Sequence, residues 1–211
     1  MCCRQCQTDT VKKLVLLFYS IVTISCHQNT QHPSGNAQTR DNQYYATELI
    51  STGFLKYAES SKIDSLKTQL KNSFDIYEED NFRIAQIDAE ELAEFSFGSF
   101  LPNLNRILAK RDFKLSAKRV NEDDKSFDIL INTDTIQLYT QKELDNQTFW
   151  DAASRNFFRK VNEMLKANDS DEQFYLLYGG NDLNALLLTG KQFSIIADYY
   201  KNEPKETPYK P

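Results

Sequence analysis

Histidine and cysteine are scarce in this sequence, and those present lie near its beginning. All four cysteines fall within the first 26 residues, and the only two histidines are His27 and His32. The chain beyond His32 therefore has no side chain for Ser-His-Asp or Cys-His catalysis, for zinc sites built from His or Cys, for haem ligation by histidine, or for thiol redox chemistry. It also lacks the distributed cysteines of a disulfide-stapled secreted domain.

An excess of basic residues is also missing. The chain has 25 Lys and Arg against 30 Asp and Glu. Because Arg4, Lys12, Lys13 and Asp9 precede Cys26, the part from Cys26 onward carries 22 basic and 29 acidic residues, a formal charge of −7. Proteins that bind nucleic acid present a basic patch to the phosphates, so we expect no nucleic-acid partner. The sequence contains neither a Walker-type phosphate loop nor a dinucleotide fingerprint, and we expect no cofactor.

The longest apolar run is too short to cross a membrane comfortably as a helix. It covers residues 14–24, follows Lys12 and Lys13, and has Ser20 and Thr23 as its only polar members. A spanning helix needs about 20 apolar residues. A positive pair followed by a short apolar core is typical of a secretory signal.

The end of this run, Thr23-Ile24-Ser25-Cys26, resembles the lipobox of bacterial lipoproteins. Ser25 and Cys26 match that motif, whereas Thr23 stands where the family prefers Leu or another aliphatic residue. The resemblance implies a signal peptide over residues 1–25, cleavage before Cys26, and acylation of the Cys26 thiol. It also implies anchoring in a lipid bilayer of the cell envelope. His27 is not the Asp that retains many enteric lipoproteins in the inner membrane, which favours the outer membrane.

Residues 26–43 contain almost no apolar side chain, which predicts a flexible polar tether after the lipidated Cys26. The alternative is that residues 14–24 form the first buried helix of the domain and that Cys26 is a small core residue. A buried helix that led into a long solvated linker would make little physical sense. The pattern therefore favours a signal, a lipid attachment point and a tether.

The remaining periodicities predict a single α+β domain over residues 44–203. The expected order of elements is α-α-β-α-β-β-β-α-β-β-α. Short turns between the strands indicate a largely antiparallel sheet of about five to six strands, with helices packed on one face. Residues 204–211 contain Pro204, Pro208 and Pro211 and are expected to form an extended, proline-rich tail.

An acidic group formed by Asp88, Glu90, Glu91 and Glu94 has two interpretations. Asp88 is placed to cap a helix whose first turn carries carboxylates, and acidic side chains there stabilise the positive end of the helix dipole. Alternatively, two carboxylates on one helical face could cleave glycosidic bonds if they flanked a cleft. Capping by a solvated first turn is the favoured interpretation.

A second candidate is the loop Tyr178-Gly179-Gly180-Asn181-Asp182, which offers backbone amides and an Asn/Asp pair to a ligand. The same residues also suit a hairpin turn that needs positive φ angles. A third candidate, residues 121–124 with Asp128, has oxygen ligands for calcium but not the spacing of an EF-hand. A solvated turn is favoured there, and we expect no metal site.

An aromatic stripe over residues 149–158 at helical spacing is more typical of a core than of a binding platform. Phe158 lies off its main face and is expected to be its most exposed member.

Together these exclusions favour a non-catalytic envelope lipoprotein that binds a protein, or a glycan. An inhibitor or immunity-type lipoprotein that shields the cell from a basic enzyme or toxin is one version, because an acidic surface speeds association with a positive partner. The alternative is a carboxylate-dependent envelope polysaccharide hydrolase that uses a pair among the carboxylates of residues 88–94.

Overall fold

The computed structural model describes residues 35–120 and 126–211. The helices in these ranges are α1 (Gly35–Ser51), α2 (Ile63–Ser73), α3 (Ala89–Ala93), α4 (Leu101–Ala109), α5 (Gln141–Asp145), α6 (Phe149–Ala167) and α7 (Gly190–Tyr199). The strands are β1 (Ile84–Gln86), β2 (Ala117–Arg119), β3 (Asp128–Ile131), β4 (Asp134–Gln137), β5 (Glu172–Leu177) and β6 (Asn184–Thr189). Three short 3-10 helices are η1 (Glu79–Asn81), η2 (Gly180–Asp182) and η3 (Pro204–Glu206). The predicted α+β class is confirmed.

Several predictions fall on other parts of the chain. The signal peptide, Cys26 and the acidic turn at residues 121–124 lie outside the described residues. Within residues 35–120 and 126–211, no helix has the length and hydrophobicity needed to cross a bilayer.

The strands form two separate antiparallel sheets, so the prediction of one sheet of five to six strands is wrong. A central sheet has the order β1-β6-β5, and a second sheet has the order β2-β3-β4. The second sheet is built from strands that follow one another directly, with Asn132 at positive φ between β3 and β4. Alternation of apolar residues shows that a strand is half-buried, but it does not show which strand pairs with which.

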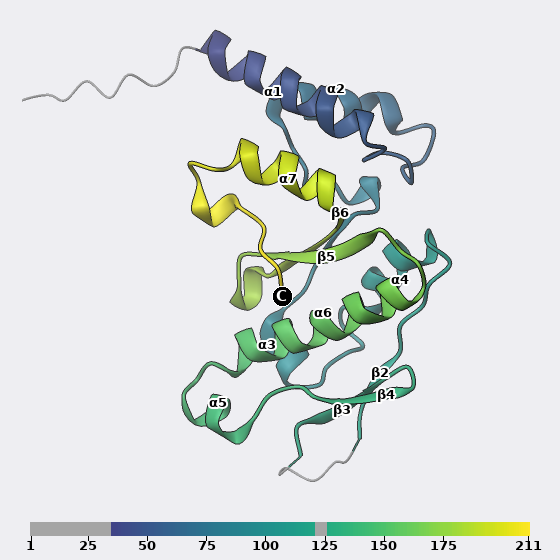
Figure 1. The fold of residues 1–211 in the computed structure, drawn as a ribbon, viewed down its shortest axis with the longest axis vertical. Coiled ribbons are helices and arrows are strands. Elements are labelled where there is room, and N and C mark those ends of the chain that lie inside the picture. Colours follow the sequence, from purple (N-terminus) through teal and green to yellow (C-terminus); the bar gives the residue numbers. More distant parts are fainter. Residues whose placement is uncertain (1–34, 121–125) are drawn as a thin grey trace, which may run out of the picture. The chain divides into compact units, whose positions relative to one another are not determined.

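The central sheet is covered by helices on both faces, which corrects the expectation of helices on one face (Figure 1). Along β5, Phe174 and Leu176 belong to one hydrophobic core, and Tyr175 and Leu177 belong to another. Helices α3, α4 and α6 contribute to the first core, and α1, α2 and α7 contribute to the second. Both β5 and β6 contain continuous four-residue apolar runs, residues 174–177 and 185–188, as strands buried on both faces usually do.

The two cores differ in their aromatic residues. We call the first the phenylalanine core, because its buried aromatic residues are Phe97, Phe100, Phe127, Tyr139, Phe157, Phe158 and Phe174. We call the second the tyrosine core, because tyrosines predominate among its buried and half-buried aromatic residues, which are Tyr45, Phe54, Phe74, Tyr77, Tyr175, Tyr178, Phe193, Tyr199 and Tyr200.

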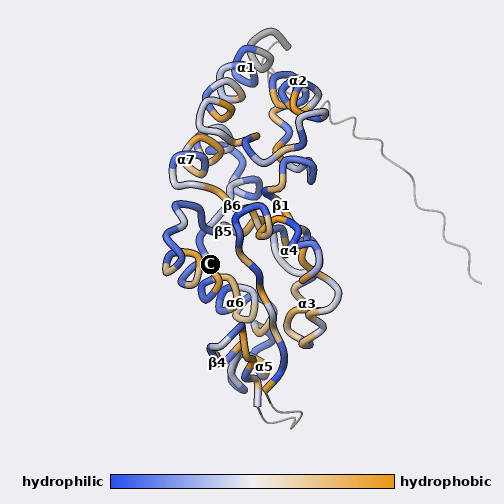
Figure 2. The backbone as a smooth tube through the Cα atoms, turned by 90° about the vertical axis from the view of Figure 1, so that its right-hand side faces the viewer, coloured by the Kyte–Doolittle hydropathy of each residue, from blue (hydrophilic) through white to orange (hydrophobic). Residues whose placement is uncertain are grey.

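The prediction that Phe158 is exposed is wrong. Its ring is fully buried and lies 5.2 Å from the rings of Phe157 and Phe174. Helix α6 buries a wide stripe of residues that includes Ser154 and Val161. Hydrophilic and hydrophobic residues are interspersed along α6, as they are along α2 (Figure 2). A single-sided helical wheel underestimates that stripe, because α6 contacts α3, β4 and β5 at once.

Helix α1 begins at Gly35, inside the segment 26–43 that was expected to be a flexible tether. Asn42 is buried, its amide donates to the Asn72 carbonyl at 2.8 Å, and its side-chain oxygen accepts from the Tyr199 hydroxyl at 2.7 Å. Apolar periodicity does not detect this start, because hydrogen bonds rather than apolar contacts fix Asn42 in place.

The C-terminal segment packs along the outer edge of β5 and does not extend away from the domain. Tyr209 exchanges backbone hydrogen bonds with Leu176 at 2.7 and 2.8 Å. Next to it, the Asn162 side chain bonds both the N–H and the carbonyl of Phe174, at 2.6 and 2.9 Å. These contacts close a sheet edge that would otherwise be open to pairing with another chain.

Candidate functional site

The predicted loop 178–182 connects β5 to β6 and contains η2. Positive φ angles occur at Tyr178 and Gly180, at 60° each, whereas Gly179 is extended. Tyr178, Asp182 and residues of β1 and β6 line a shallow depression of about 230 Å³. The loop therefore carries one positive-φ glycine and one strained tyrosine at the rim of a small hollow.

The Tyr178 hydroxyl is occupied by contacts within the domain. It donates to the carboxylate of Glu206 in η3 and lies 3.2 Å from the Tyr77 hydroxyl. Tyr77 donates to the same Glu206 oxygen at 2.8 Å. Burial, followed by the contacts with Tyr178 and Glu206, raises the pKa of Tyr77 above its ordinary value. This geometry holds the C-terminal segment on the domain, so the loop's most distinctive side chain has a structural contact.

The acidic group at residues 88–94 begins with a helix cap. Asp88 Oδ1 accepts from the backbone N–H groups of Glu90 and Glu91 at 2.9 and 3.3 Å, so the predicted capping by Asp88 is confirmed. The five main depressions among the described residues are lined by other side chains. The geometry thus supports the capping role over a carboxylate pair across a cleft.

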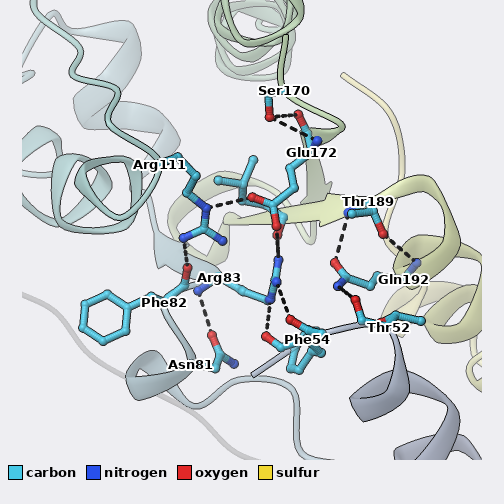
Figure 3. Close-up of polar contacts among 12 residues, drawn as sticks. Thr52, Phe54, Asn81, Phe82, Arg83, Arg111, Ser170, Glu172, Thr189 and Gln192 are labelled. Carbon is cyan, nitrogen blue, oxygen red and sulfur yellow. Dashed lines mark hydrogen bonds and ion pairs between the residues drawn. The ribbon is translucent and has the colours of Figure 1, made fainter. Parts of the chain in front are cut away.

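A buried charge network, which the sequence did not predict, joins the segment that follows α1 to the central sheet (Figure 3). Glu172 accepts from Arg83 Nη1 at 2.7 Å and from Arg111 Nε at 2.8 Å. The three side chains are only 1 to 6 % exposed. Arg83 also donates to the backbone carbonyl group of Phe54. It donates to the carbonyl groups of Gly53 at 3.1 Å and of Leu187 at 3.0 Å as well.

This network is structural and is not suited to acid–base chemistry. Burial opposes the charge on Glu172, but the hydrogen bonds and positive charges of Arg111 and Arg83 outweigh it and hold the pKa of Glu172 below its ordinary value. Each carboxylate oxygen already accepts from an arginine. A carboxylate that is kept ionised and fully paired has no free position for a transferred proton.

A depression of about 470 Å³ lies between α6, β5 and the C-terminal segment. Its charged lining consists of Arg159, Glu163, Lys166, Asp171, Glu172 and Lys210. Glu172 is already paired with Arg83 and Arg111, so three basic and two acidic side chains remain, and the depression has no acidic excess that would favour a cation.

A different surface combines hollows, tyrosines and an acidic excess. Two depressions, of about 400 and 300 Å³, share Tyr45 of α1 and Asp198 of α7. We call this the α1/α7 surface, and it is lined by Asp41, Asn42, Tyr44, Tyr45, Glu48, Lys191, Ser194, Ile195, Asp198, Tyr199, Lys201, Asn202 and Glu203. Its charged lining comprises four carboxylates and two lysines.

Tyr45 and Asp198 are held together at the centre of this surface. The Tyr45 hydroxyl donates to Asp198 Oδ2 at 2.5 Å, and Lys201 lies 3.2 Å from Asp198 Oδ1. The hydrogen bond to Asp198, with a smaller effect of burial, raises the pKa of Tyr45 to about 12. The same hydrogen bond, followed by that from Lys201, lowers the pKa of Asp198.

Aromatic rings continue from this surface into the tyrosine core. The Tyr44 side chain is 62 % exposed, and its ring meets the Tyr45 ring edge-on at 5.2 Å. Tyr45 in turn contacts Tyr199 at 5.3 Å, and Tyr199 lies 4.0 Å from Phe74. The tyrosines at residues 44–45 and 199–200 were the available sequence signal, but Asp41 had been placed in the tether.

Comparison of the chain with protein-family models, with curated proteins and with solved structures found no match. The proposed function therefore rests on the residues of this chain alone.

Proposed function

We propose that this protein is a cell-envelope lipoprotein, anchored in the outer membrane through acylated Cys26, whose folded domain is a non-catalytic module that binds a protein partner. The α1/α7 surface carries the proposal. Aromatic residues are enriched at protein–protein interfaces, and an excess of carboxylates favours a basic partner. An inhibitor or immunity-type module that neutralises a basic enzyme or toxin is the specific form that this surface supports.

The anchor is supported by the order of features in the sequence. Lys12 and Lys13, the apolar run 14–24, and Ser25-Cys26 follow one another as they do in bacterial lipoproteins. Two or more acyl chains on one cysteine give stable anchoring, because each buried methylene contributes about 0.8 kcal/mol.

A non-catalytic role is supported by how the carboxylates of the domain are used. Asp88 caps α3, Glu172 is paired with two arginines, and Glu206 accepts from two tyrosines. Each of these groups has a structural contact that a catalytic carboxylate would have to give up.

The anchor can be tested with two cysteine variants of the full chain. Cys26→Ser is expected to lose acylation and membrane association, whereas Cys6→Ser, the matched control, is expected to behave as wild type. The measurements are membrane fractionation and mass spectrometry of the mature N-terminal peptide. Membrane-bound Cys26→Ser protein of normal mature size would overturn the anchor.

The binding function can be tested by affinity capture from envelope extracts with the wild-type lipoprotein as bait. We expect a basic protein that stays bound at moderate salt and whose association slows as the salt concentration rises, because exposed charges are screened within about 10 Å at 0.1 M. Loss of every captured protein at moderate salt would contradict the proposal.

A further inference from the structure

The two halves of the α1/α7 surface differ in chemistry. The larger depression is lined mainly by polar groups and includes Asp41, Asp198 and Glu203. The smaller one includes the exposed ring of Tyr44 and the side chain of Ile195. The hydrogen-bonded pair of Tyr45 and Asp198 belongs to both. The surface therefore offers a charged position and an apolar position side by side.

The charged position has unpaired negative charge. Among the described residues, Asp198 is paired with Lys201, whereas Asp41 and Glu203 make no ion pair. Both are exposed. Burial, and then the negative charges of Glu203 and Asp41, raise the pKa of Tyr199, which lies in the same depression. Asp41 and Glu203 thus raise the pKa of the Tyr199 hydroxyl, and all three side chains line one depression of about 400 Å³.

Rings at this position add to the attraction for a cation. Tyr45 and Tyr199 line the larger depression together with the free carboxylates. A guanidinium or ammonium group is attracted by the carboxylates, and nearby aromatic rings favour a cation over an anion. A cationic side chain therefore fits the larger depression better than an anionic or neutral one.

We propose that the α1/α7 surface is the docking surface for a basic partner, with an arginine or lysine side chain between Asp41, Asp198 and Glu203 and a neighbouring apolar side chain against Tyr44 and Ile195. This inference rests on the proposed binding function and adds which kind of partner side chain enters each half of the surface. The depression beside α6 is larger but has no acidic excess, so depression size does not decide the choice. Charge complementarity decides it.

The test uses the mature lipoprotein in detergent micelles and two capped tetrapeptides as probes, Gly-Arg-Leu-Gly and Gly-Glu-Leu-Gly. Chemical-shift mapping is expected to place the arginine peptide at Tyr45, Ser194 and Asp198, with no saturable shifts from the glutamate peptide. In a double variant, Asp41→Asn with Glu203→Gln, the arginine peptide is expected to bind about tenfold more weakly, because two exposed charge contacts are lost.

The matched control removes two carboxylates from the other depression, as Glu163→Gln with Asp171→Asn, and is expected to leave the affinity unchanged. An equal loss in the control, or shifts centred on Arg159 and Lys166, would overturn the docking surface. In that case a partner still captured from envelope extracts would leave the binding function standing. Failure of the capture as well would remove the proposed function itself.

Discussion

The two cores on either side of the central sheet use aromatic residues in different ways. In the phenylalanine core, six phenylalanines are buried. The rings of five contact one another, and the sixth, Phe127, stacks on Tyr139. In the tyrosine core, hydroxyls reach outward to polar partners, as Tyr45 does to Asp198 and Tyr77 does to Glu206. A tyrosine presents an apolar body and a polar tip, so it can pack in a core and meet water at once.

Under the proposed function, this difference separates stability from recognition within one domain. The phenylalanine core includes residues of the second sheet, and its buried tyrosine, Tyr139, donates to the Ala93 carbonyl at 3.1 Å. The tyrosine core has fewer buried members, and its residues Tyr45 and Tyr199 line the α1/α7 surface, where the proposed partner would dock. Rings that are already held by hydrogen bonds lose little conformational freedom when they are bound.

The largest expected effect of a substitution lies in the phenylalanine core. Phe157 is fully buried and contacts Phe97, Phe100 and Phe158. Phe157→Ala should cost about 3–5 kcal/mol of unfolding free energy, through lost burial and a residual cavity. Denaturant unfolding of the full chain measures it. A loss below about 1 kcal/mol would mean that this core is not close-packed.

The second effect tests the network that links the tyrosine core to the sheet. Glu172→Gln should cost about 3 kcal/mol, because it leaves Arg83 and Arg111 buried without a counter-charge. Glu163→Gln, on the exposed face of α6, is the control and should be nearly neutral. Equal stability of the two variants would show that water reaches the arginines.

A third effect lies at the capped end of α3, beside the phenylalanine core. Asp88→Ala should cost about 1 kcal/mol, and Asp88→Asn should keep most of the stability, because asparagine also accepts from the N-terminal amides. A polysaccharide hydrolase that used Asp88 would instead lose its activity in both variants. Glycan hydrolysis by the wild type that disappears in Asp88→Asn would contradict the capping interpretation.

The smallest effect concerns Tyr45 on the α1/α7 surface. The folded pKa of about 12 lies above the ordinary value of 10, so the contribution of Tyr45 to stability is fully present below pH 10 and is lost as the pH rises to about 12. Tyr45→Phe should therefore lose less stability between these values than the wild type, and the pKa of Asp198 should rise. Unfolding at alkaline pH and side-chain NMR titration measure the two effects. An unchanged pKa of Asp198 in the Tyr45→Phe variant would rule out the hydrogen bond between the two side chains.

Local signals in the sequence predicted much of the fold. The cap of α3 by Asp88 and the turn between β5 and β6 depend on neighbouring residues and were predicted correctly. Sheet partners and the second helical layer depend on contacts between distant residues, which apolar periodicity does not specify. The ion pair between Arg83 and Glu172, for example, joins two residues that lie 89 positions apart in the chain.

The candidate site was less predictable than the fold. The glycines and polar residues of the loop 178–182 predicted a candidate ligand-binding loop. In the structure, the Tyr178 hydroxyl instead donates to Glu206. The α1/α7 surface needs two helices that are far apart in the chain, and α1 begins among polar residues such as Asn42. No prediction from the sequence identified this surface.

The most direct test of the account is site-specific photocrosslinking in cells with the intact lipoprotein. A benzoylphenylalanine at position 44, on the α1/α7 surface, is compared with one at position 159, beside the α6 depression. We predict a crosslinked basic protein at position 44 that is lost when Asp41→Asn and Glu203→Gln are added, and none at position 159. Crosslinking at position 159 alone would contradict the account.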